Sequence, residues 1–321
     1  MREKMSNKLK SPKKVLVTGG AGFIGSNLVR LLIEQGFVVR VLDNLSTGYI
    51  KNIENLPIEF VQGDICDANL VQSVVDGVDT IFHLAAHIGN VKSLEYPLKD
   101  AQINILGAVN LLEKAHKVGV RRIVYSSSAA IFGELLTMPI AEDHPQNPDS
   151  PYGVSKLAAE KYMLTFAKLY DMTVICLRYF NVYGVHQRYD AYGNVIPIFA
   201  DRLMMGKPVT IYGTGEQTRD FVNVKDVAQA NFLAATRAQH TGVYNLGSGF
   251  DITINTLASY CQEASGVKAV EVVNAPPRRG EVLHCRADIS KARSDLGFEP
   301  NPDILSGLQE YFDWFKKDRN I

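Results

Sequence analysis

A short β-branched run, Lys14–Thr18, leads directly into the stretch Gly19-Gly-Ala-Gly22-Phe-Ile-Gly25, and apolar residues at helical spacing follow. This order predicts a strand, a tight turn and a helix. Gly19 would allow the turn, Gly22 the close approach of a pyrophosphate, and Gly25 the close packing of helix on strand. The helix dipole and the N–H groups of the first helical turn, at Phe23 and Ile24, would hold the phosphates. The stretch therefore predicts a dinucleotide-binding βαβ fold.

An acidic residue stands where such a fold needs one. Residues 37–42 read as the second strand, and Asp43 lies at its carboxyl end, 18 residues after Gly25. A carboxylate there accepts hydrogen bonds from both ribose hydroxyls of adenosine and repels a 2′-phosphate, which favours NAD over NADP. The alternative is that Asp43 is a turn residue before Asn44. Asn44 is a cofactor-binding candidate beside it.

Further candidates fall at the ends of the next predicted strands. Asp64 follows the third strand, 58–62, where it could accept from the adenine amino group or cap the next helix. The fourth strand, 80–86, ends in small residues that would let the dinucleotide pass close by. Ser128 follows the fifth strand, 121–125. Ligands of parallel α/β sheets bind at the carboxyl ends of the strands, so this convergence predicts a site. The cofactor-binding candidates at these ends are Asp64, Ile65, Leu84, Ala85 and Ala86.

The alternation of strands and helices predicts an α/β protein with a Rossmann-type doubly wound parallel sheet. A helix is expected over 92–118, where Asn104 is a polar amide among apolar neighbours and a cofactor-site candidate with a hydrogen-bonding role. The expected division is an NAD-binding domain over 13–180, with returning segments near 220–250, and a smaller, interleaved α/β substrate-binding lobe over 181–321. The other expected elements are helices at 152–170, 195–205, 225–237, 254–264 and 304–317, and strands at 173–177, 209–212 and 242–246.

Composition excludes several classes of function. The 321 residues carry 34 Lys+Arg and 34 Asp+Glu, so there is no electrostatic case for binding nucleic acid or an anionic membrane. No apolar stretch reaches about 18 residues, and the basic start lacks the apolar core of a secretory signal. The four scattered cysteines read as free thiols of a reducing, cytoplasmic compartment. His83 and His87 have no partners at metal-ligand spacing, so we expect no metal, one packed histidine and one near solvent.

Tyr152 and Lys156 lie four residues apart at the start of an apolar-periodic run. In a helix the two side chains share a face. A nearby ammonium favours the phenolate and lowers the phenol pKa from about 10. The pair could thus act as a general base toward a sugar or alcohol hydroxyl. Alone the motif is weak, because Tyr-x-x-x-Lys often marks no more than an exposed helix start.

Together these motifs resemble the extended short-chain dehydrogenase/reductase family. The matching stretches occur in the family's order over residues 13–318, and within the family the chain resembles the NAD-dependent nucleotide-sugar epimerases of the UDP-glucose 4-epimerase type. The resemblance implies that Tyr152 is the catalytic base, that Lys156 binds the nicotinamide ribose and keeps Tyr152 deprotonated, and that Ser128 is the catalytic serine. It implies that Tyr179 touches the nicotinamide end. It also implies a homodimer formed through the helices 92–118 and 152–170.

The same resemblance implies a UDP-sugar substrate. Arg219 and Arg278 align with two arginines that bind its diphosphate, which suits guanidinium geometry. The remaining substrate-binding candidates are Ser128, Asn181, Asn194, Tyr212, Glu281 and Cys285.

Two departures refine the expected reaction. Ser128 is followed by Ala129 and Ala130, whereas the related 4,6-dehydratases carry an Asp-Glu pair there and UDP-glucuronate decarboxylases a glutamate, so epimerisation is favoured. Cys285 stands where hexose-only epimerases have a tyrosine, which predicts room for a 2-N-acetyl group. The alternative is that Cys285 is a packed core thiol.

Other functions stay open at this point. A UDP-glucuronate 4-epimerase or decarboxylase would need an extra cation in the sugar pocket, and Arg188 and Lys92 are the candidates. A non-catalytic, NAD-sensing binding protein could use the same fold. An intact Ser128, Tyr152 and Lys156 argue against a sensor, because a sensor needs none of them.

Overall fold

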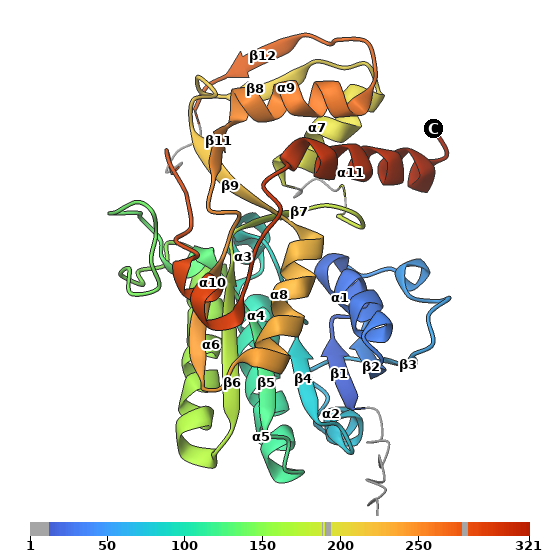
Figure 1. The fold of residues 1–321 in the computed structure, drawn as a ribbon, viewed down its shortest axis with the longest axis vertical. Helices are drawn as coiled ribbons and strands as arrows, with labels where there is room; N and C mark the ends of the chain where they lie inside the picture. Colours follow the sequence, from blue (N-terminus) through green and yellow to red (C-terminus); the bar gives the residue numbers. More distant parts are fainter. Residues whose placement is uncertain (1–12, 188, 190–193, 278–281) are drawn as a thin grey trace, which may run out of the picture.

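A parallel sheet of seven strands forms the centre of the larger lobe (Figure 1). The computed structural model describes residues 13–187, 189, 194–277 and 282–321. The strand order is β10-β6-β5-β4-β1-β2-β3, so the chain winds outward in both directions from β1. Such a reversal between β1 and β4 opens a crevice at their carboxyl ends, where ligands bind. The strands are β1 (Lys14–Thr18), β2 (Val38–Asp43), β3 (Glu59–Gln62), β4 (Thr80–His83), β5 (Arg122–Ser128), β6 (Thr173–Tyr179) and β10 (Gly242–Leu246).

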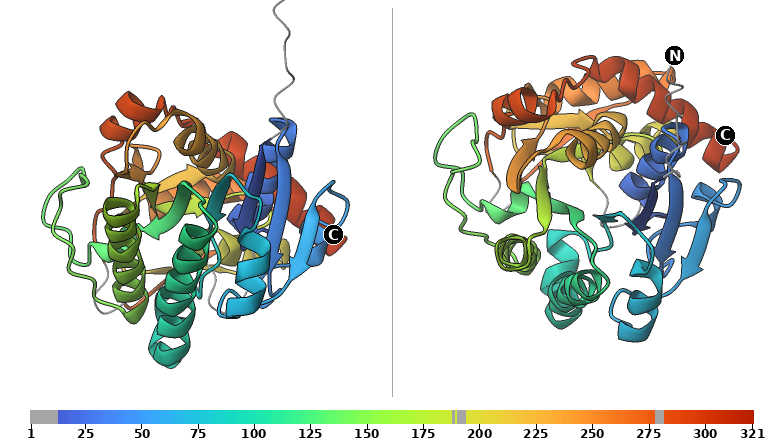
Figure 2. Two further views of the ribbon diagram at one scale, coloured as in Figure 1. Left: turned by 90° about the horizontal axis from the view of Figure 1, so that it is seen from below. Right: turned by 60° about the horizontal axis from the view of Figure 1, so that its bottom comes forward.

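Helices cover both faces of this sheet, as the doubly wound prediction requires (Figure 2). Neighbouring residues of a strand point to opposite faces. Val15 and Val17 therefore pack with α1 (Phe23–Glu34) and α8 (Val224–Arg237) in one core, while Leu16 packs with helices of the other face. Those helices are α2 (Ala68–Val75), α5 (Ala108–Lys117) and α6 (Pro151–Tyr170). The predicted fold class is confirmed.

The smaller lobe has its own apolar core, which includes Phe199, Leu257, Tyr311 and Phe312. One of its two sheets joins β7 (Asn181–Tyr183), β9 (Thr218–Asn223) and β11 (Asp251–Thr253), and the other joins β8 (Val209–Tyr212) and β12 (Val272–Ala275). The helices packed on them are α7 (Val195–Met204), α9 (Ile254–Ser265) and α11 (Ile304–Arg319).

The chain passes between the lobes more than once. After β9 it returns through α8 and β10, and β10 pairs with β6 at the edge of the large sheet. The short helix α10 (Ser290–Leu296) then packs against α8 and β10. The expected boundary near residue 180 stays a prediction.

The single helix expected over 92–118 is wrong. The structure has α3 (Asn90–Glu95), α4 (Pro97–Ala101), a π-helical turn η2 (Gln102–Gly107) and then α5. Pro97 explains the first break, because a residue before proline is pushed out of helical conformation, and Tyr96 has φ −131° and ψ 59°. No helix within the described residues combines the length and apolar character needed to cross a membrane.

Candidate active site

The glycine turn between β1 and α1 has the geometry that a dinucleotide needs. Gly19 has φ +73°, and a Cβ on it would lie 2.7 Å from the amide nitrogen of Ala85. A Cβ on Gly25 would lie 2.1 Å from the carbonyl oxygen of Gly19, so only glycine lets α1 start this close to the strand. At the N-cap of α1, Gly22 places no side chain over the helix end, and the first turn holds no acidic residue. The first-turn N–H groups, at Phe23 and Ile24, are therefore available to phosphate.

The acidic residues at the ends of β2 and β3 organise the neighbouring loops. Asp43 is buried and accepts hydrogen bonds from the N–H groups of Ala21 (2.9 Å) and Leu45 (2.8 Å), so it fastens the glycine turn and also acts as a turn residue. Its burial raises the pKa of the carboxyl. Each carboxylate oxygen can still accept a further bond from a ribose hydroxyl.

Asp64 does not cap the next helix, so that alternative is wrong. It accepts from the Cys66 N–H and the Asn44 amide, each at 2.9 Å, and this places Asn44 beside it. The cap of α2 is Asp67, which accepts from two N–H groups of the first turn. Ile65, predicted like Asp64 to bind the cofactor, is buried in the core beneath α2 and α5.

The segment after β4 is bound tightly to its neighbours. The Thr18 hydroxyl contacts His83 Nδ1 at 2.7 Å and accepts from the N–H groups of Leu84 and Ala85 at 3.2 Å. Ala86, also expected at the cofactor, lies partly exposed at this edge. Burial, and then Lys156, lower the pKa of His83 to about 3, so this histidine is the packed one.

The side chain of Asn104 forms hydrogen bonds to the segment after β4 and does not point outward. Its amide donates to the His87 carbonyl (2.9 Å) and the Ser155 hydroxyl (3.0 Å), and its oxygen accepts from the His87 N–H (2.8 Å). His87 is therefore not near solvent as expected, since its ring contacts buried Asp100 and its side chain is 12% exposed. The described residues bring together no group of His, Cys, Asp and Glu that could hold a metal.

Ser128, Tyr152 and Lys156 meet at the carboxyl end of β5. Ser128 ends β5 and its hydroxyl accepts from the Ala130 N–H at 3.1 Å, while Tyr152 and Lys156 occupy the first turns of α6, which Ser150 caps. The Ser128 side chain is close enough to Tyr152 to lower the pKa of the phenol. Lys156 is buried, with Nζ 4.5 Å from the centre of the Tyr125 ring. The structure thus assembles the three predicted catalytic residues.

The electrostatics of the pair differ from the sequence expectation. Burial raises the pKa of Tyr152 to about 12, although the hydrogen bond from Ser128 lowers it. Burial lowers the pKa of Lys156 to about 7, although Asp100, Cys176 and Glu160 raise it. Desolvation disfavours both charged forms and here exceeds the effect of the neighbouring ammonium. In the protein alone the expected lowering of the phenol pKa is therefore wrong.

Tyr179 and Asn181, expected at the nicotinamide and the substrate, make bonds within the protein. The Tyr179 hydroxyl bonds to the buried amide of Asn231 on α8, so its side chain faces that helix. The Asn181 amide donates to the Asp220 carbonyl at 3.1 Å. Their roles toward ligands stay predictions.

The substrate-binding candidates gather partly around β9. Arg219 lies on β9 and is close enough to Cys285 for its charge to act on the thiol. Cys285 is partly buried, and burial raises its pKa to about 12. Asn194 is exposed at the N-cap of α7 and its side chain makes no capping bond, and Tyr212 is exposed at the end of β8. The expected candidates Arg278 and Glu281, and the possible cation Arg188, lie outside the described residues.

Sequence reasoning missed the buried charges beneath the site. Asp100 on α4 is 1% exposed, yet it acts electrostatically on both Tyr152 and Lys156. A carboxylate four residues before Asn104, on the apolar side of a helical pattern, is the signal that could have found it. Glu160 on α6 pairs with Arg178 at 2.7 Å and accepts from the Ser127 hydroxyl at 2.6 Å, so a buried ion pair supports the strand end that carries Ser128.

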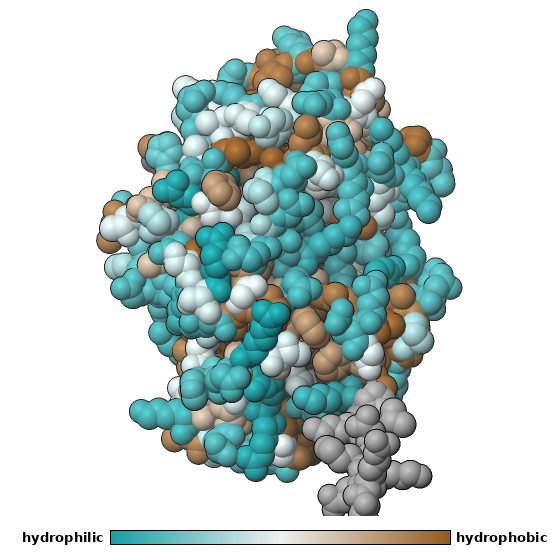
Figure 3. All heavy atoms as spheres, viewed as in Figure 1, coloured by the Kyte–Doolittle hydropathy of each residue, from teal (hydrophilic) through white to brown (hydrophobic). Residues whose placement is uncertain are grey.

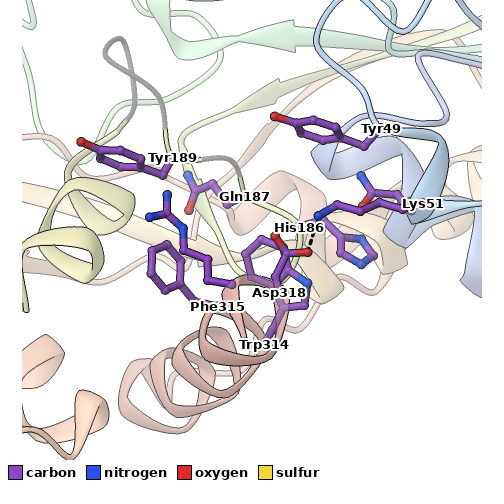
Figure 4. A pocket seen from close by; sticks show the side chains of 10 residues that line it. Tyr49, Lys51, His186, Gln187, Tyr189, Trp314, Phe315 and Asp318 are labelled. Atoms are coloured by element: carbon purple, nitrogen blue, oxygen red, sulfur yellow. Dashed lines mark hydrogen bonds and ion pairs between the residues drawn. The ribbon is translucent and has the colours of Figure 1, made fainter. Parts of the chain in front are cut away.

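Within the described residues, two pockets lie beside the cluster formed by Ser128, Tyr152 and Lys156. One of about 420 Å³ separates α4 from the start of α6 and reaches Asp100. The other, of about 150 Å³, lies between the lobes (Figure 4), where η1 (Ile50–Asn52) faces Trp314 and Asp318 of α11. An ion pair of 2.6 Å between Lys51 and Asp318 crosses it.

Comparisons with known proteins agree with this geometry. The model of the NAD dependent epimerase/dehydratase family matches residues 15–247. The chain belongs to this family. The cofactor is NAD, and the glycine turn, the open N-terminus of α1 and Asp43 fit it. Relatives include the putative UDP-glucose 4-epimerase of Methanocaldococcus jannaschii, 41% identical over 95% of this chain and 99% of the relative.

Solved structures of the family superpose over nearly the whole chain. The UDP-glucose 4-epimerase of Thermotoga maritima, solved with UDP-glucose, is 38% identical with a TM-score of 0.90 over 95% of this chain and 99% of its own. The UDP-N-acetylglucosamine 4-epimerase of Methanobrevibacter ruminantium, solved with UDP-N-acetylmuramic acid, is 34% identical with a TM-score of 0.91 over 96% and 100%. Relatives with another reaction also match, such as a dTDP-glucose 4,6-dehydratase of Actinoplanes, 32% identical over 96% and 99%.

Proposed function

We propose that this protein is a UDP-sugar 4-epimerase that interconverts UDP-glucose and UDP-galactose, and also UDP-N-acetylglucosamine and UDP-N-acetylgalactosamine. The observation that carries the proposal is the placement of Ser128 at the end of β5 beside Tyr152 of α6, with buried Lys156 one helical turn on, at the crevice end of an NAD-binding sheet. The names of the similar epimerases support the same reaction.

Each catalytic residue has a defined task in this reaction. NAD, when bound, would supply the acceptor and later the donor of the C4 hydride. Tyr152 takes the proton of the 4-hydroxyl, and Ser128, which lies beside Tyr152, holds the C4 oxygen as it becomes a carbonyl. The charge of Lys156 favours the phenolate that this step requires. Because the pKa of Tyr152 is about 12 in the protein alone, Tyr152 needs a nearby positive charge to act as a base near neutral pH.

Between the two hydride transfers the keto sugar must present its other face. This requires tight binding of the nucleotide and loose binding of the sugar. Arg219 on β9 and Arg278 are proposed to hold the diphosphate, with Asn181, Asn194, Tyr212 and Glu281 as further contacts. Guanidinium groups suit phosphate oxygens because they bind them in pairs.

The residues after Ser128 favour epimerisation over loss of water. Ala129 and Ala130 form a short 3₁₀ turn, η3 (Ala129–Ile131), and carry no acid or base. A 4,6-dehydratase needs both in addition to the tyrosine. The proposal of an acetamido-sugar substrate depends on Cys285, which lies beside Arg219 and is smaller than a tyrosine.

The test is incubation of the purified protein with UDP-glucose, UDP-N-acetylglucosamine and UDP-glucuronate, followed by chromatographic separation of the products. We expect the 4-epimers of the first two. Tyr152→Phe should reduce turnover about 10²–10⁴-fold, and near-full turnover of that variant would refute the assignment of the base. Conversion of UDP-glucuronate alone would favour a uronate enzyme, and conversion of none, with NAD bound, would favour an NAD sensor.

We also propose a homodimer that works in the cytoplasm. On the face seen in Figure 3, hydrophobic residues are scattered among hydrophilic ones. Exposed apolar side chains follow one another along the neighbouring elements α3, α4, η2 and α6: Val91, Leu94, Leu98, Leu106, Val154 and Leu169. Leu98 is 87% exposed. Light scattering after gel filtration should give twice the mass of 35.5 kDa, and Leu98→Glu should shift it toward the monomer.

A further inference from the structure

A buried carboxylate lies beneath the catalytic pair without a defined role in the reaction. Asp100 on α4 is 1% exposed, and it lies at the wall of the 420 Å³ cavity between α4 and α6. Its Oδ2 lies 3.2 Å from the Asn104 amide nitrogen, which shares its two hydrogens among this oxygen, the His87 carbonyl and the Ser155 hydroxyl, and 3.3 Å from His87 Nδ1. Its Oδ1 is buried and has no hydrogen-bond partner within the described residues. A half-satisfied buried carboxylate is costly, which calls for a compensating role.

Several titratable groups surround this carboxylate. The titratable groups around it come from four places: His87 after β4, Tyr125 on β5, Tyr152 and Lys156 on α6, and Asp149 across the cavity. Of these, His87 and Lys156 are the groups that can carry a positive charge. Lys156 is itself buried, so each of the two charges lowers the cost of burying the other.

The negative charge of Asp100 raises the pKa of both Tyr152 and Lys156. Its charge raises the pKa of Lys156, ahead of Cys176 and Glu160, and so opposes the effect of burial. It also raises the pKa of Tyr152, which burial has already raised. Through Asn104, Asp100 is joined to Ser155, the residue before Lys156.

We propose that Asp100 is a positioning residue of the active site, whose buried carboxylate stabilises the ammonium of Lys156 and, through Asn104, fixes the first turn of α6. The kinetic part of this proposal rests on the proposed epimerase activity, and the electrostatic part does not.

The test replaces Asp100 with asparagine, which keeps the shape and removes the charge. The asparagine oxygen can accept from Asn104 as Oδ2 does, and its amide takes the place of the unbonded Oδ1. Loss of the negative charge favours deprotonation of both Tyr152 and Lys156. Both limbs of the pH profile of kcat should therefore move to lower pH, by roughly one unit. A structural role alone would lower kcat at every pH and leave both limbs in place.

A second measurement reads Lys156 without any reaction. In protein carrying ¹³Cε-lysine, the Lys156 signal is the one absent from Lys156→Met, and in the wild type without cofactor we expect it to titrate near pH 7. In Asp100→Asn it should titrate at lower pH. If the wild type epimerises no sugar, the proposed function fails and this titration still decides the role of Asp100.

Controls separate charge from shape. Asp149→Asn removes an exposed carboxylate on the same cavity and should leave the limbs and the titration unchanged. Asp100→Glu keeps the charge, has the cavity for its extra methylene, and should restore the wild-type limbs. If Asp100→Asn does not fold, Asp100→Ser carries the same test, since water can enter from the cavity. Unchanged limbs and an unchanged Lys156 titration would overturn the proposal.

Discussion

Burial of the Lys156 ammonium destabilises the folded protein, and replacing Lys156 with methionine should remove that cost. The side chain is 2% exposed, and burial lowers its pKa from 10.5 to about 7. Asp100, Cys176 and Glu160 raise this pKa, but by less than burial lowers it. Each pH unit of this difference corresponds to about 1.4 kcal/mol. The charged side chain therefore costs the folded state roughly 5 kcal/mol below pH 7. Methionine fills the space of the lysine stem without the charge.

The advantage of the variant should depend on pH. Below about pH 7, Lys156 is charged in the folded and the unfolded chain, and the wild type carries the full cost. Between about pH 7 and 10.5 the folded chain has lost a proton that the unfolded chain keeps, so wild-type stability rises with pH. The variant lacks this rise. The stability difference between Lys156→Met and the wild type should therefore shrink by about 2 kcal/mol from pH 7 to pH 9.

Urea unfolding of the cofactor-free protein, followed by the fluorescence of the single tryptophan and by circular dichroism, measures this difference. Lys161→Met is the matched control, because Lys161 is exposed on the same helix and its ammonium stays in water in both states. Its effect should be the same at each pH. A Lys156→Met effect that is equally independent of pH would refute the reasoning.

Three further changes test the framework of the site. Gly25→Ala brings a Cβ to 2.1 Å from a carbonyl oxygen of the turn and should weaken NAD binding roughly tenfold or more, as measured by fluorescence titration; unchanged affinity would contradict the close packing. Glu160→Gln leaves the buried Arg178 guanidinium unpaired and should cost about 3–5 kcal/mol in urea unfolding, whereas Glu310→Gln in an exposed ion pair should cost at most about 1 kcal/mol. Asp220→Ala removes the acceptor of four hydrogen bonds and should cost about 3 kcal/mol or more, with faster amide exchange at its former donors; unchanged exchange would contradict those bonds.

Elements with strong local signals could be predicted from sequence. The strand at Lys14–Thr18 was predicted with its bounds, and the long helix starting at Tyr152 differs by one residue from α6. The strands β7, β9, β11 and β12 were not predicted. They have three to six residues each, and β7, β9 and β11 form one small sheet from segments up to 70 residues apart. Each pairs with a strand about 30–40 residues away, and pairing at such a separation leaves little trace in local periodicity.

For Tyr152 and Lys156, the sequence predicts the relative position of the side chains but not their pKa values. The spacing of Tyr152 and Lys156 places both side chains on one face of a helix, and that depends only on helical geometry. The direction of their pKa shifts depends on how much water the fold removes from them, and here burial reverses the expected effect on Tyr152. Spacing carries no information on desolvation.

The sequence by itself predicted the cofactor turn at Gly19–Gly25 and the acid at Asp43, because each is a short-range pattern with a geometric cause, and the family resemblance predicted Ser128, Tyr152 and Lys156 as the catalytic side chains. Only the tertiary structure decided which residues surround them. Asp100 lies 52 residues before Tyr152 and on another helix, yet packing places its carboxylate within electrostatic reach of the pair. Buried electrostatics depends on distance and dielectric environment, and both exist only once the chain has folded.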